Sequence, residues 1–239
     1  MGNVVIFGDS ILKGVLLSDG KYSLSKSIAW NKIEEKLDIK IKNLSKMGST
    51  LPKSAESIKN YIERNSTEIH RVVLEYGGND SDYDWQQVAE RASKAHSPKT
   101  DYMLFMSTLC ELIEFVLNKG IEVTLMTLPP INAELYFKWI SRNSDKIDKE
   151  NILFFLGDIE IIYRRQEMYS NAFMKAAHRY KLDLVDARFN FLSHDNYTSL
   201  LCEDGIHPNE KGEDLIVESF LEFYEQKRSS GKSLLHNLV

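Results

Sequence analysis

The sequence contains few of the residues that define disulfide-rich, fibrous or membrane-spanning proteins. Its two cysteines, Cys110 and Cys202, are too few for a disulfide framework or a four-cysteine zinc site. Only 12 glycines and 5 prolines occur among 239 residues, which excludes collagen-like and linker-like chains. No segment approaches the ~20 consecutive apolar residues that a transmembrane helix requires. The remaining composition is that of a globular protein, with 43% hydrophobic and 27% charged residues.

An excess of basic charge is also absent, because 30 Lys and Arg residues are opposed by 35 Asp and Glu residues. Binding to a nucleic-acid backbone requires a basic surface, so we expect no nucleic-acid partner. The N-terminal Met1-Gly2-Asn3 leads directly into the apolar run Val4–Phe7, without the basic n-region and the long apolar stretch of a secretion signal. We interpret both cysteines as buried, reduced thiols and predict a cytoplasmic location.

Short apolar runs alternate with longer helical patterns along the chain. Most runs are rich in Val, Ile and Leu, which is typical of parallel strands covered on both faces. Their alternation with helices predicts an α/β fold, a doubly wound α/β sandwich with right-handed crossovers. We expect strands at Asn3–Phe7, Ile39–Leu44, Arg71–Tyr76, Ile121–Met126 and Leu182–Val185, and helices at Ser25–Lys36, Lys53–Arg64, Tyr102–Asn118, Ile159–Tyr180 and Glu210–Gln226.

The chain shows no internal repeat or linker, so we expect a single domain at residues 1–228 and a frayed or loosely docked tail at 229–239. Two segments, 81–100 and 131–157, follow the carboxyl ends of strands, where open α/β sheets bind their ligands. We expect them to form loops or short helices that shape a pocket, although their aromatic residues could equally well only cap the core. The aromatic side chains expected to contact a substrate are Tyr83, Trp85, Tyr136 and Trp139.

Gly8-Asp9-Ser10 directly follows the first predicted strand. The glycine permits a tight turn, and the serine would then lie at the carboxyl edge of the sheet. Its hydroxyl could attack an acyl carbon if a base lay nearby, since serine alone is a weak nucleophile. Taken by itself, the pattern is more typical of a serine in a turn or at a helix N-terminus.

Asp204 and His207 lie three residues apart, before the last predicted helix. At this spacing the carboxylate can bind one imidazole nitrogen and fix the tautomer, which leaves the other nitrogen available as a base. Pro208 favours an extended backbone at His207 and therefore predicts a loop. By itself, the pair is more typical of a turn aspartate beside a surface histidine.

Two further loops contain candidate donors to a negatively charged oxygen. The Asn79 amide of Gly77-Gly78-Asn79-Asp80 is one, although such a sequence is also typical of a plain turn. The backbone N–H of Gly48 is another, although a single glycine says little alone. The four patterns fall at one edge of the predicted sheet, and each supplies a different part of an acyl-transfer site. Their chance coincidence is improbable.

In order and approximate spacing, these residues resemble the four sequence blocks of the SGNH (GDSL-type) hydrolases. The resemblance extends from residue 4 to about residue 225. It implies a flavodoxin-like three-layer α/β/α sandwich with a parallel five-stranded sheet, ester-hydrolysing activity and no cofactor or metal. It also implies that Ser10 is the nucleophile, His207 the base and Asp204 its support. The oxyanion hole would comprise the N–H groups of Ser10 and Gly48 with the Asn79 side chain.

The resemblance leaves the substrate and the acceptor open. The segment 131–157 is longer than in compact members of the family, and we favour short acyl groups on polar or carbohydrate molecules. An acyltransferase with a sugar or alcohol acceptor would use the same residues, and a non-catalytic binding module could share the sheet. The α/β-hydrolase motif Gly-x-Ser-x-Gly and the dinucleotide motif Gly-x-Gly-x-x-Gly are both absent. The oligomeric state cannot be predicted.

Overall fold

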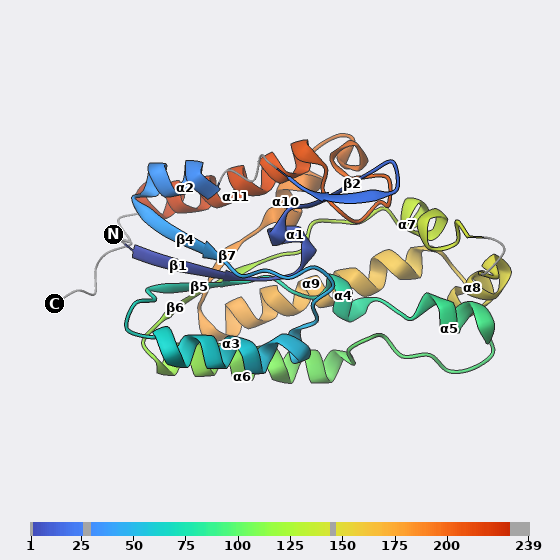
Figure 1. Cartoon of the computed structure of the whole chain (residues 1–239), viewed down its shortest axis with the longest axis horizontal. Helices are drawn as coiled ribbons and strands as arrows, with labels where there is room; N and C mark the ends of the chain where they lie inside the picture. The colour runs from blue at the N-terminus through green and yellow to red at the C-terminus, as the bar shows by residue number, and fades with distance from the viewer. Residues whose placement is uncertain (1, 26–29, 144–146, 230–239) are drawn as a thin grey trace.

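The computed structural model describes residues 2–25, 30–143 and 147–229 and is built around a five-stranded parallel sheet (Figure 1). The strand order β4-β1-β5-β6-β7 reverses direction at β1, which confirms the predicted doubly wound, flavodoxin-like arrangement. All five predicted strands are present. They are β1 (Gly2–Phe7), β4 (Ile39–Asn43), β5 (Arg71–Leu74), β6 (Glu122–Met126) and β7 (Asp183–Val185).

Helices cover both faces of the sheet, which explains the continuous apolar runs. Val72 and Leu74 of β5 pack into one core layer, whereas Val73 between them packs into the other. The first layer lies under α3 (Leu51–Asn65), α6 (Tyr102–Asn118) and α9 (Glu160–Tyr180). The second lies under α2 (Trp30–Leu37), α10 (Ala187–Leu192) and α11 (Glu210–Ser229). These helices include the five that the sequence predicts.

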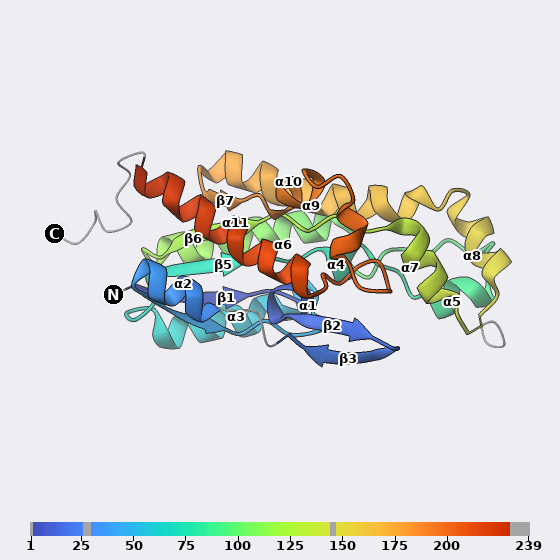
Figure 2. The same ribbon diagram turned by 90° about the horizontal axis from the view of Figure 1, so that it is seen from above.

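A third apolar cluster extends the molecule beyond the carboxyl edge of the sheet (Figures 1 and 2). It forms where the two unassigned segments fold into short helices, as the sequence suggested. These helices, α5 (Trp85–Glu90), α7 (Ala133–Ile140) and α8 (Lys149–Leu156), pack with the first turns of α9. Their apolar side chains form an apolar surface next to this edge of the sheet.

An antiparallel hairpin of β2 (Val15–Ser18) and β3 (Lys21–Leu24) was not predicted. Its strands have four residues each and β3 is exposed throughout, so no hydrophobic alternation marks them. The remaining short elements are α1 (Ser10–Lys13), α4 (Gly78–Ser81) and the 3₁₀ helix η1 (Tyr197–Leu200).

Two expectations reach past the part of the chain that the structure describes. The predicted helix at Ser25–Lys36 is described only from Trp30, since residues 26–29 lie outside it, and most of the predicted tail, 230–239, also lies outside it. Within residues 2–25, 30–143 and 147–229, no helix combines the length and apolarity needed to cross a bilayer.

Candidate active site

Ser10 lies at the first position of α1, and only Gly8 and Asp9 separate it from the end of strand β1. The Asp9 carboxylate caps this short helix and accepts a hydrogen bond of 2.9 Å from the N–H of Ile11. The cap fixes the turn at the carboxyl edge of the sheet. Ser10 is 7% exposed, so its hydroxyl lies at the bottom of a cavity rather than on an open surface.

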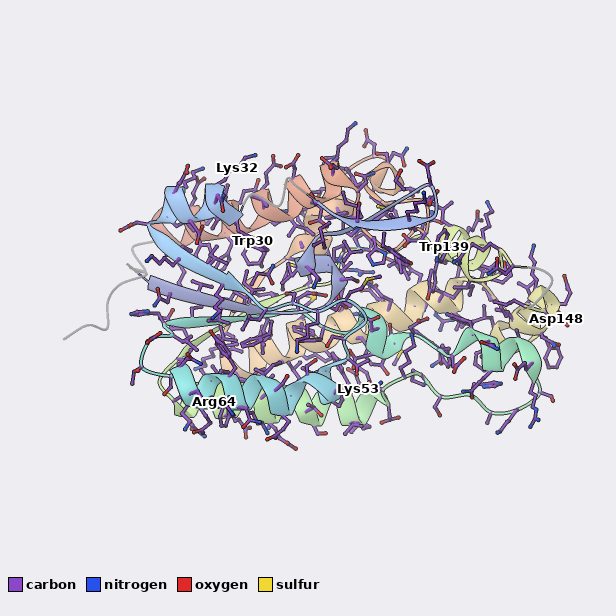
Figure 3. The ribbon with its side chains drawn as sticks, in the orientation of Figure 1. Trp30, Lys32, Lys53, Arg64, Trp139 and Asp148 are labelled. Atoms are coloured by element: carbon purple, nitrogen blue, oxygen red, sulfur yellow. The ribbon has the colours of Figure 1, made fainter. Side chains whose placement is uncertain are left out.

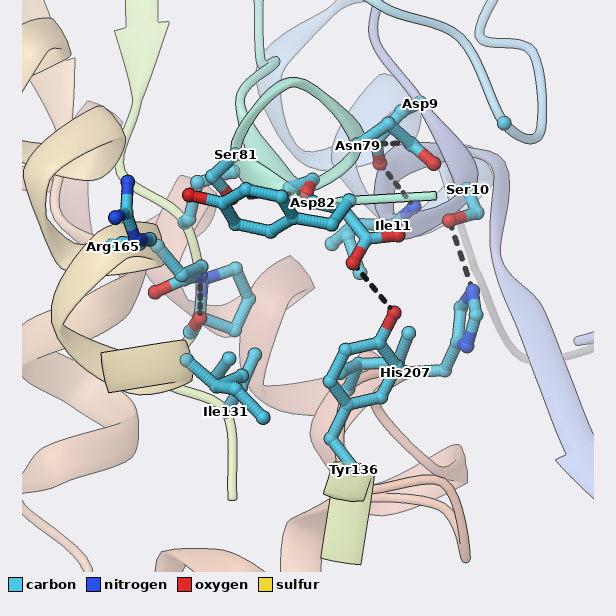
Figure 4. A pocket seen from close by; sticks show the side chains of 18 of the residues that line it. Asp9, Ser10, Ile11, Asn79, Ser81, Asp82, Ile131, Tyr136, Arg165 and His207 are labelled. Atoms are coloured by element: carbon cyan, nitrogen blue, oxygen red, sulfur yellow. Dashed lines mark hydrogen bonds between the residues drawn. The ribbon is translucent and has the colours of Figure 1, made fainter. Parts of the chain in front are cut away.

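The loop before α11 places His207 opposite Ser10, as Figure 4 shows. The Ser10 hydroxyl lies 2.9 Å from Nε2 of His207, and Nδ1 of the same ring lies 2.6 Å from Oδ2 of Asp204. Asp204 is fully buried, and its other oxygen accepts from the N–H groups of Ile206 and His207, each at 3.1 Å. The three predicted side chains therefore form one hydrogen-bonded chain from residues almost 200 positions apart in sequence.

Two further predicted residues, Asn79 and Gly48, line the same cavity. Nδ2 of Asn79 donates to the Asp9 carboxylate at 3.0 Å, which fixes the amide beside Ser10 and leaves its second hydrogen available. Gly48 has a φ of +71°. Among the described residues, the backbone N–H groups of Ser10 and Gly48 donate to no acceptor. Such donors suit an oxygen atom that gains negative charge.

Three buried carboxyl groups, those of Asp9, Glu75 and Asp80, lie behind the Ser10 turn. Burial is the main reason why the pKa of each is raised, and for Glu75 the pKa is well above its usual value because Asp9 lies beside it. The N–H of Asp9 donates to Glu75 at 3.3 Å. Burial and the neighbouring Asp9 thus favour the protonated form of Glu75, and the Asp9 carboxylate accepts from the Asn79 amide.

A cavity of about 200 Å³ opens from Ser10 toward the third apolar cluster. Three of the four aromatic residues expected to contact substrate, Tyr83, Trp85 and Tyr136, line it. The indole N–H of Trp85 and the hydroxyl of Tyr136 both donate to Oδ1 of Asp82, at 2.7 and 2.9 Å. Burial raises the pKa of Tyr136 well above its usual value, so this hydroxyl stays a donor.

The fourth aromatic residue, Trp139, does not line the cavity, contrary to the sequence-based expectation. It lies on α7 with its indole ring 3.6 Å from the Arg142 guanidinium, and it packs against the third cluster (Figure 3). Tyr136, one turn away, takes the inward position because a short helix presents only one face to the cavity.

Several residues that line the cavity were not singled out from the sequence, and they include Tyr22, Asp82 and Arg165. Tyr22 belongs to the hairpin, and its ring meets the His207 ring edge-on with centroids 5.7 Å apart. Arg165 lies in the middle of α9, where nothing in the sequence distinguishes it from its neighbour Arg164. The position of Asp82, two residues after the Asp80 motif, was the only available hint.

The geometry supports proton transfer from a hydroxyl to a carboxylate-oriented imidazole, next to N–H groups that can bind an oxyanion. Among the described residues, no group of three or more His, Cys, Asp and Glu side chains is arranged to hold a metal ion.

Comparison of the sequence with known families and proteins gives two matches. The model of the GDSL-like Lipase/Acylhydrolase family matches residues 6–215. A rice protein (Oryza sativa subsp. japonica), GDSL esterase/lipase WDL1, is 24% identical over 157 residues. That alignment covers 65% of this chain and 53% of the rice protein, so the chain spans about half the length of this relative.

Several solved structures share the fold across nearly the whole chain. A lipase/acylhydrolase from Enterococcus faecalis has a TM-score of 0.64 at 16% identity, covering 96% of this chain and 97% of that chain. An acetyl xylan esterase from Geobacillus stearothermophilus has a TM-score of 0.64 at 17% identity, covering 93% and 94%. The psychrotrophic esterase EstA from Pseudoalteromonas sp. has a TM-score of 0.59 at 17% identity, covering 96% and 100%. At these identities, the likeness establishes the fold.

Proposed function

Because the chain belongs to the GDSL-like lipase/acylhydrolase family, we propose that it is a serine esterase that cleaves carboxylic esters through an acyl-enzyme at Ser10. The substrates we propose are short acyl groups on polar or carbohydrate molecules. One observation carries the proposal: the hydrogen-bonded chain from the Ser10 hydroxyl through His207 to Asp204, at 2.9 and 2.6 Å.

In the proposed reaction, His207 accepts the Ser10 proton as the oxygen attacks the ester carbonyl. The carbonyl oxygen becomes negatively charged and is bound by the N–H groups of Ser10 and Gly48 and by the free hydrogen of Asn79, each worth about 3 kcal/mol when well aligned. His207 then protonates the leaving alcohol. Water attacks the acyl-enzyme in the same way and releases the acid.

The buried Asp204 stabilises the imidazolium that forms in both steps and holds the ring in the reactive orientation. Asp9 acts indirectly, since it caps the turn that presents Ser10 and also anchors the Asn79 amide. The reaction needs a neutral imidazole at His207, because only that form can accept the Ser10 proton.

The substrate class draws support from the small cavity of about 200 Å³ and from the acetyl xylan esterase among the similar structures. Transfer of the acyl group to a sugar or alcohol would use the same acyl-enzyme. Product analysis with and without an added alcohol distinguishes the two, because a transferase yields a new ester in place of the free acid.

Hydrolysis of short aryl esters by the wild type and by Ser10→Ala tests the proposal. We expect Ser10→Ala to lower kcat by about 10⁴-fold or more, with an unchanged circular dichroism spectrum. Ser45→Ala is the matched control, because Ser45 is also a buried serine near the end of a strand but does not line the cavity. Equal turnover in Ser10→Ala and wild type, or failure of a fluorophosphonate to label Ser10, would contradict the proposal.

A further inference from the structure

The cavity has a distinct far end, remote from Ser10 and His207 (Figure 4). Between the two ends its walls are largely apolar, and they come from the third cluster and the loops that follow the strands. The apolar side chains include Leu128, Ile131, Leu156, Ile162 and Ile206. Polar side chains also line the cavity, and among them Arg165, at this far end, lies against Tyr83.

Tyr83 presents a buried hydroxyl that lacks a hydrogen-bond partner among the described residues. The side chain is 3% exposed, and its ring is fixed between the Trp85 and Phe155 rings, with centroids 5.4 and 5.3 Å away. An unsatisfied buried hydroxyl is costly, so this arrangement points to a ligand atom that completes the hydrogen bond. Burial also raises the pKa of Tyr83, which keeps the group protonated and able to donate.

Arg165 adds a positive charge at the same place. Its guanidinium carbon lies 5.2 Å from the centre of the Tyr83 ring, and the residue is half-buried on α9. Within the described residues it forms no ion pair, whereas the two more deeply buried arginines, Arg71 and Arg188, each bind a carboxylate. No side-chain hydrogen bond from the Arg165 guanidinium to another described residue is present either, so its N–H donors can bind a ligand.

The carboxylate that lines the cavity nearby does not neutralise Arg165. Asp82 already accepts from Trp85 and Tyr136 through Oδ1, and Lys99 pairs with Oδ2 at 2.7 Å. With the charges of Asp82 and Lys99 compensating each other, the far end carries the unpaired positive charge of Arg165. A planar guanidinium next to a hydroxyl donor is suited to a carboxylate.

We propose that Arg165 and Tyr83 form a carboxylate-binding subsite, so that the preferred substrates are esters with a carboxylate separated from the reacting ester group by an apolar spacer. This inference rests on the proposed esterase function and specifies its substrate class. The carboxylate could belong to the acyl part or to the alcohol part of the ester. In either case water adds across the ester bond, and one product retains the second carboxylate.

Matched aryl esters test the subsite. In the first arm, kcat/KM is compared for 4-nitrophenyl hexanoate and the mono-4-nitrophenyl ester of adipic acid, which has the same chain length and a terminal carboxylate. In the second arm, phenyl acetate is compared with 4-acetoxybenzoate, whose carboxylate is in the alcohol part. We expect the wild type to have the higher kcat/KM for the charged ester in one of the two arms, namely the one whose carboxylate is in the same part of the ester as in the natural substrate.

Arg165→Met should lower kcat/KM for that charged ester by at least about tenfold and leave its neutral partner within about twofold. Tyr83→Phe should also lower kcat/KM for the charged ester and spare the neutral one, but by a smaller factor. Arg164→Met is the matched control, because Arg164 is the exposed neighbour on the same helix and does not line the cavity. Arg164→Met should leave the ratio of kcat/KM for the charged ester to that for the neutral ester unchanged in both arms.

The outcomes separate this inference from the esterase proposal. Hydrolysis of the neutral esters with no preference for a charged ester in either arm, or an equal effect of Arg165→Met on charged and neutral esters, overturns the subsite and leaves the esterase intact. If no ester is hydrolysed, the esterase proposal fails, and calorimetry with adipate and hexanoate decides the subsite. The subsite requires that adipate binds more tightly than hexanoate and that Arg165→Met removes the difference, and any other result overturns it.

Discussion

Gly48 and Gly205 share a left-handed backbone, with φ of +71° and +72°, but have different surroundings. A Cβ atom at Gly48 would meet nothing within 4 Å, whereas one at Gly205 would lie 2.6 Å from Cβ of Leu135. We expect Gly48→Ala to cost about 1 kcal/mol from backbone strain alone. Gly205→Ala should cost clearly more in urea unfolding and also lower kcat, because relief of the clash moves the loop of Asp204 and His207. Equal losses of stability would contradict this reasoning.

Asp80 makes stability depend on pH through its buried carboxyl group. Burial raises its pKa from 3.8 to about 7, although Leu51 donates its N–H to both carboxyl oxygens. Above pH ~4 the unfolded chain releases this proton while the folded protein retains it. The contribution of Asp80 to the free energy of unfolding therefore falls as pH rises from about 4 to about 7.

Asp80→Asn should remove this dependence, because an amide oxygen can still accept from Leu51 but never becomes charged. Relative to the wild type, the variant should gain stability as pH rises, by at most about 4 kcal/mol. Urea unfolding of both proteins from pH ~4 to ~8 measures the difference. A constant difference across this range would show that Asp80 does not titrate there.

At the level of elements, the features that could be predicted from the sequence are those that a local sequence pattern determines. The buried strands appear as Val-rich and Ile-rich runs, and residues that directly follow parallel strands must converge at one edge, so Ser10, Gly48 and Asn79 could be placed together. Arg165 could not, because it lies in mid-helix and reaches the cavity only through the packing of α5, α7 and α8 against α9. Exposed β3 likewise shows no alternation.

The hairpin depends on a long-range contact with the loop that holds His207. Sγ of Cys202 accepts from the N–H of Leu17 and donates to the carbonyl oxygen of Pro208, both at 3.3 Å. Burial raises the pKa of this thiol to about 11, so it remains protonated and able to donate. Cys202 therefore joins the hairpin to the loop.

Cys202→Ala should destabilise the protein by about 1–2 kcal/mol, since it leaves a buried N–H and a buried carbonyl without their partner. Cys202→Ser, which retains a donor and an acceptor, is the matched control and should lose less. Thermal unfolding compares the two. If serine and alanine cost the same, the hydrogen bonds do not contribute and only the volume of the sulfur matters.

On the scale of the whole molecule, we assign catalysis to one edge of the sheet and stabilisation of the fold by ion pairs to the other. The candidate active site lies at the carboxyl edge, while ion pairs around the buried Arg71 lie at the amino edge, where β5, β6 and β7 begin. There Arg71, 4% exposed, binds Asp183 at 2.5 Å and also pairs with Glu122. Lys227 of α11 binds the same Asp183. Arg71 thereby connects three neighbouring strands to each other at their first residues.

Arg71→Leu should destabilise the protein by about 3 kcal/mol and leave kcat/KM unchanged, because it leaves Asp183 underpaired at the end of the sheet remote from Ser10. Burial raises the pKa of Asp183, but Arg71 and Lys227 outweigh burial and lower it. The stability from this lowered pKa is present above the ordinary pKa of Asp and is lost as pH falls through the folded-state value, so the penalty should shrink in acid.

Arg64→Leu, on the exposed surface of α3 (Figure 3), is the control and should cost less than about 0.5 kcal/mol. A loss of activity in folded Arg71→Leu would show that the two edges are coupled, and the assignment of separate tasks to them would then be wrong.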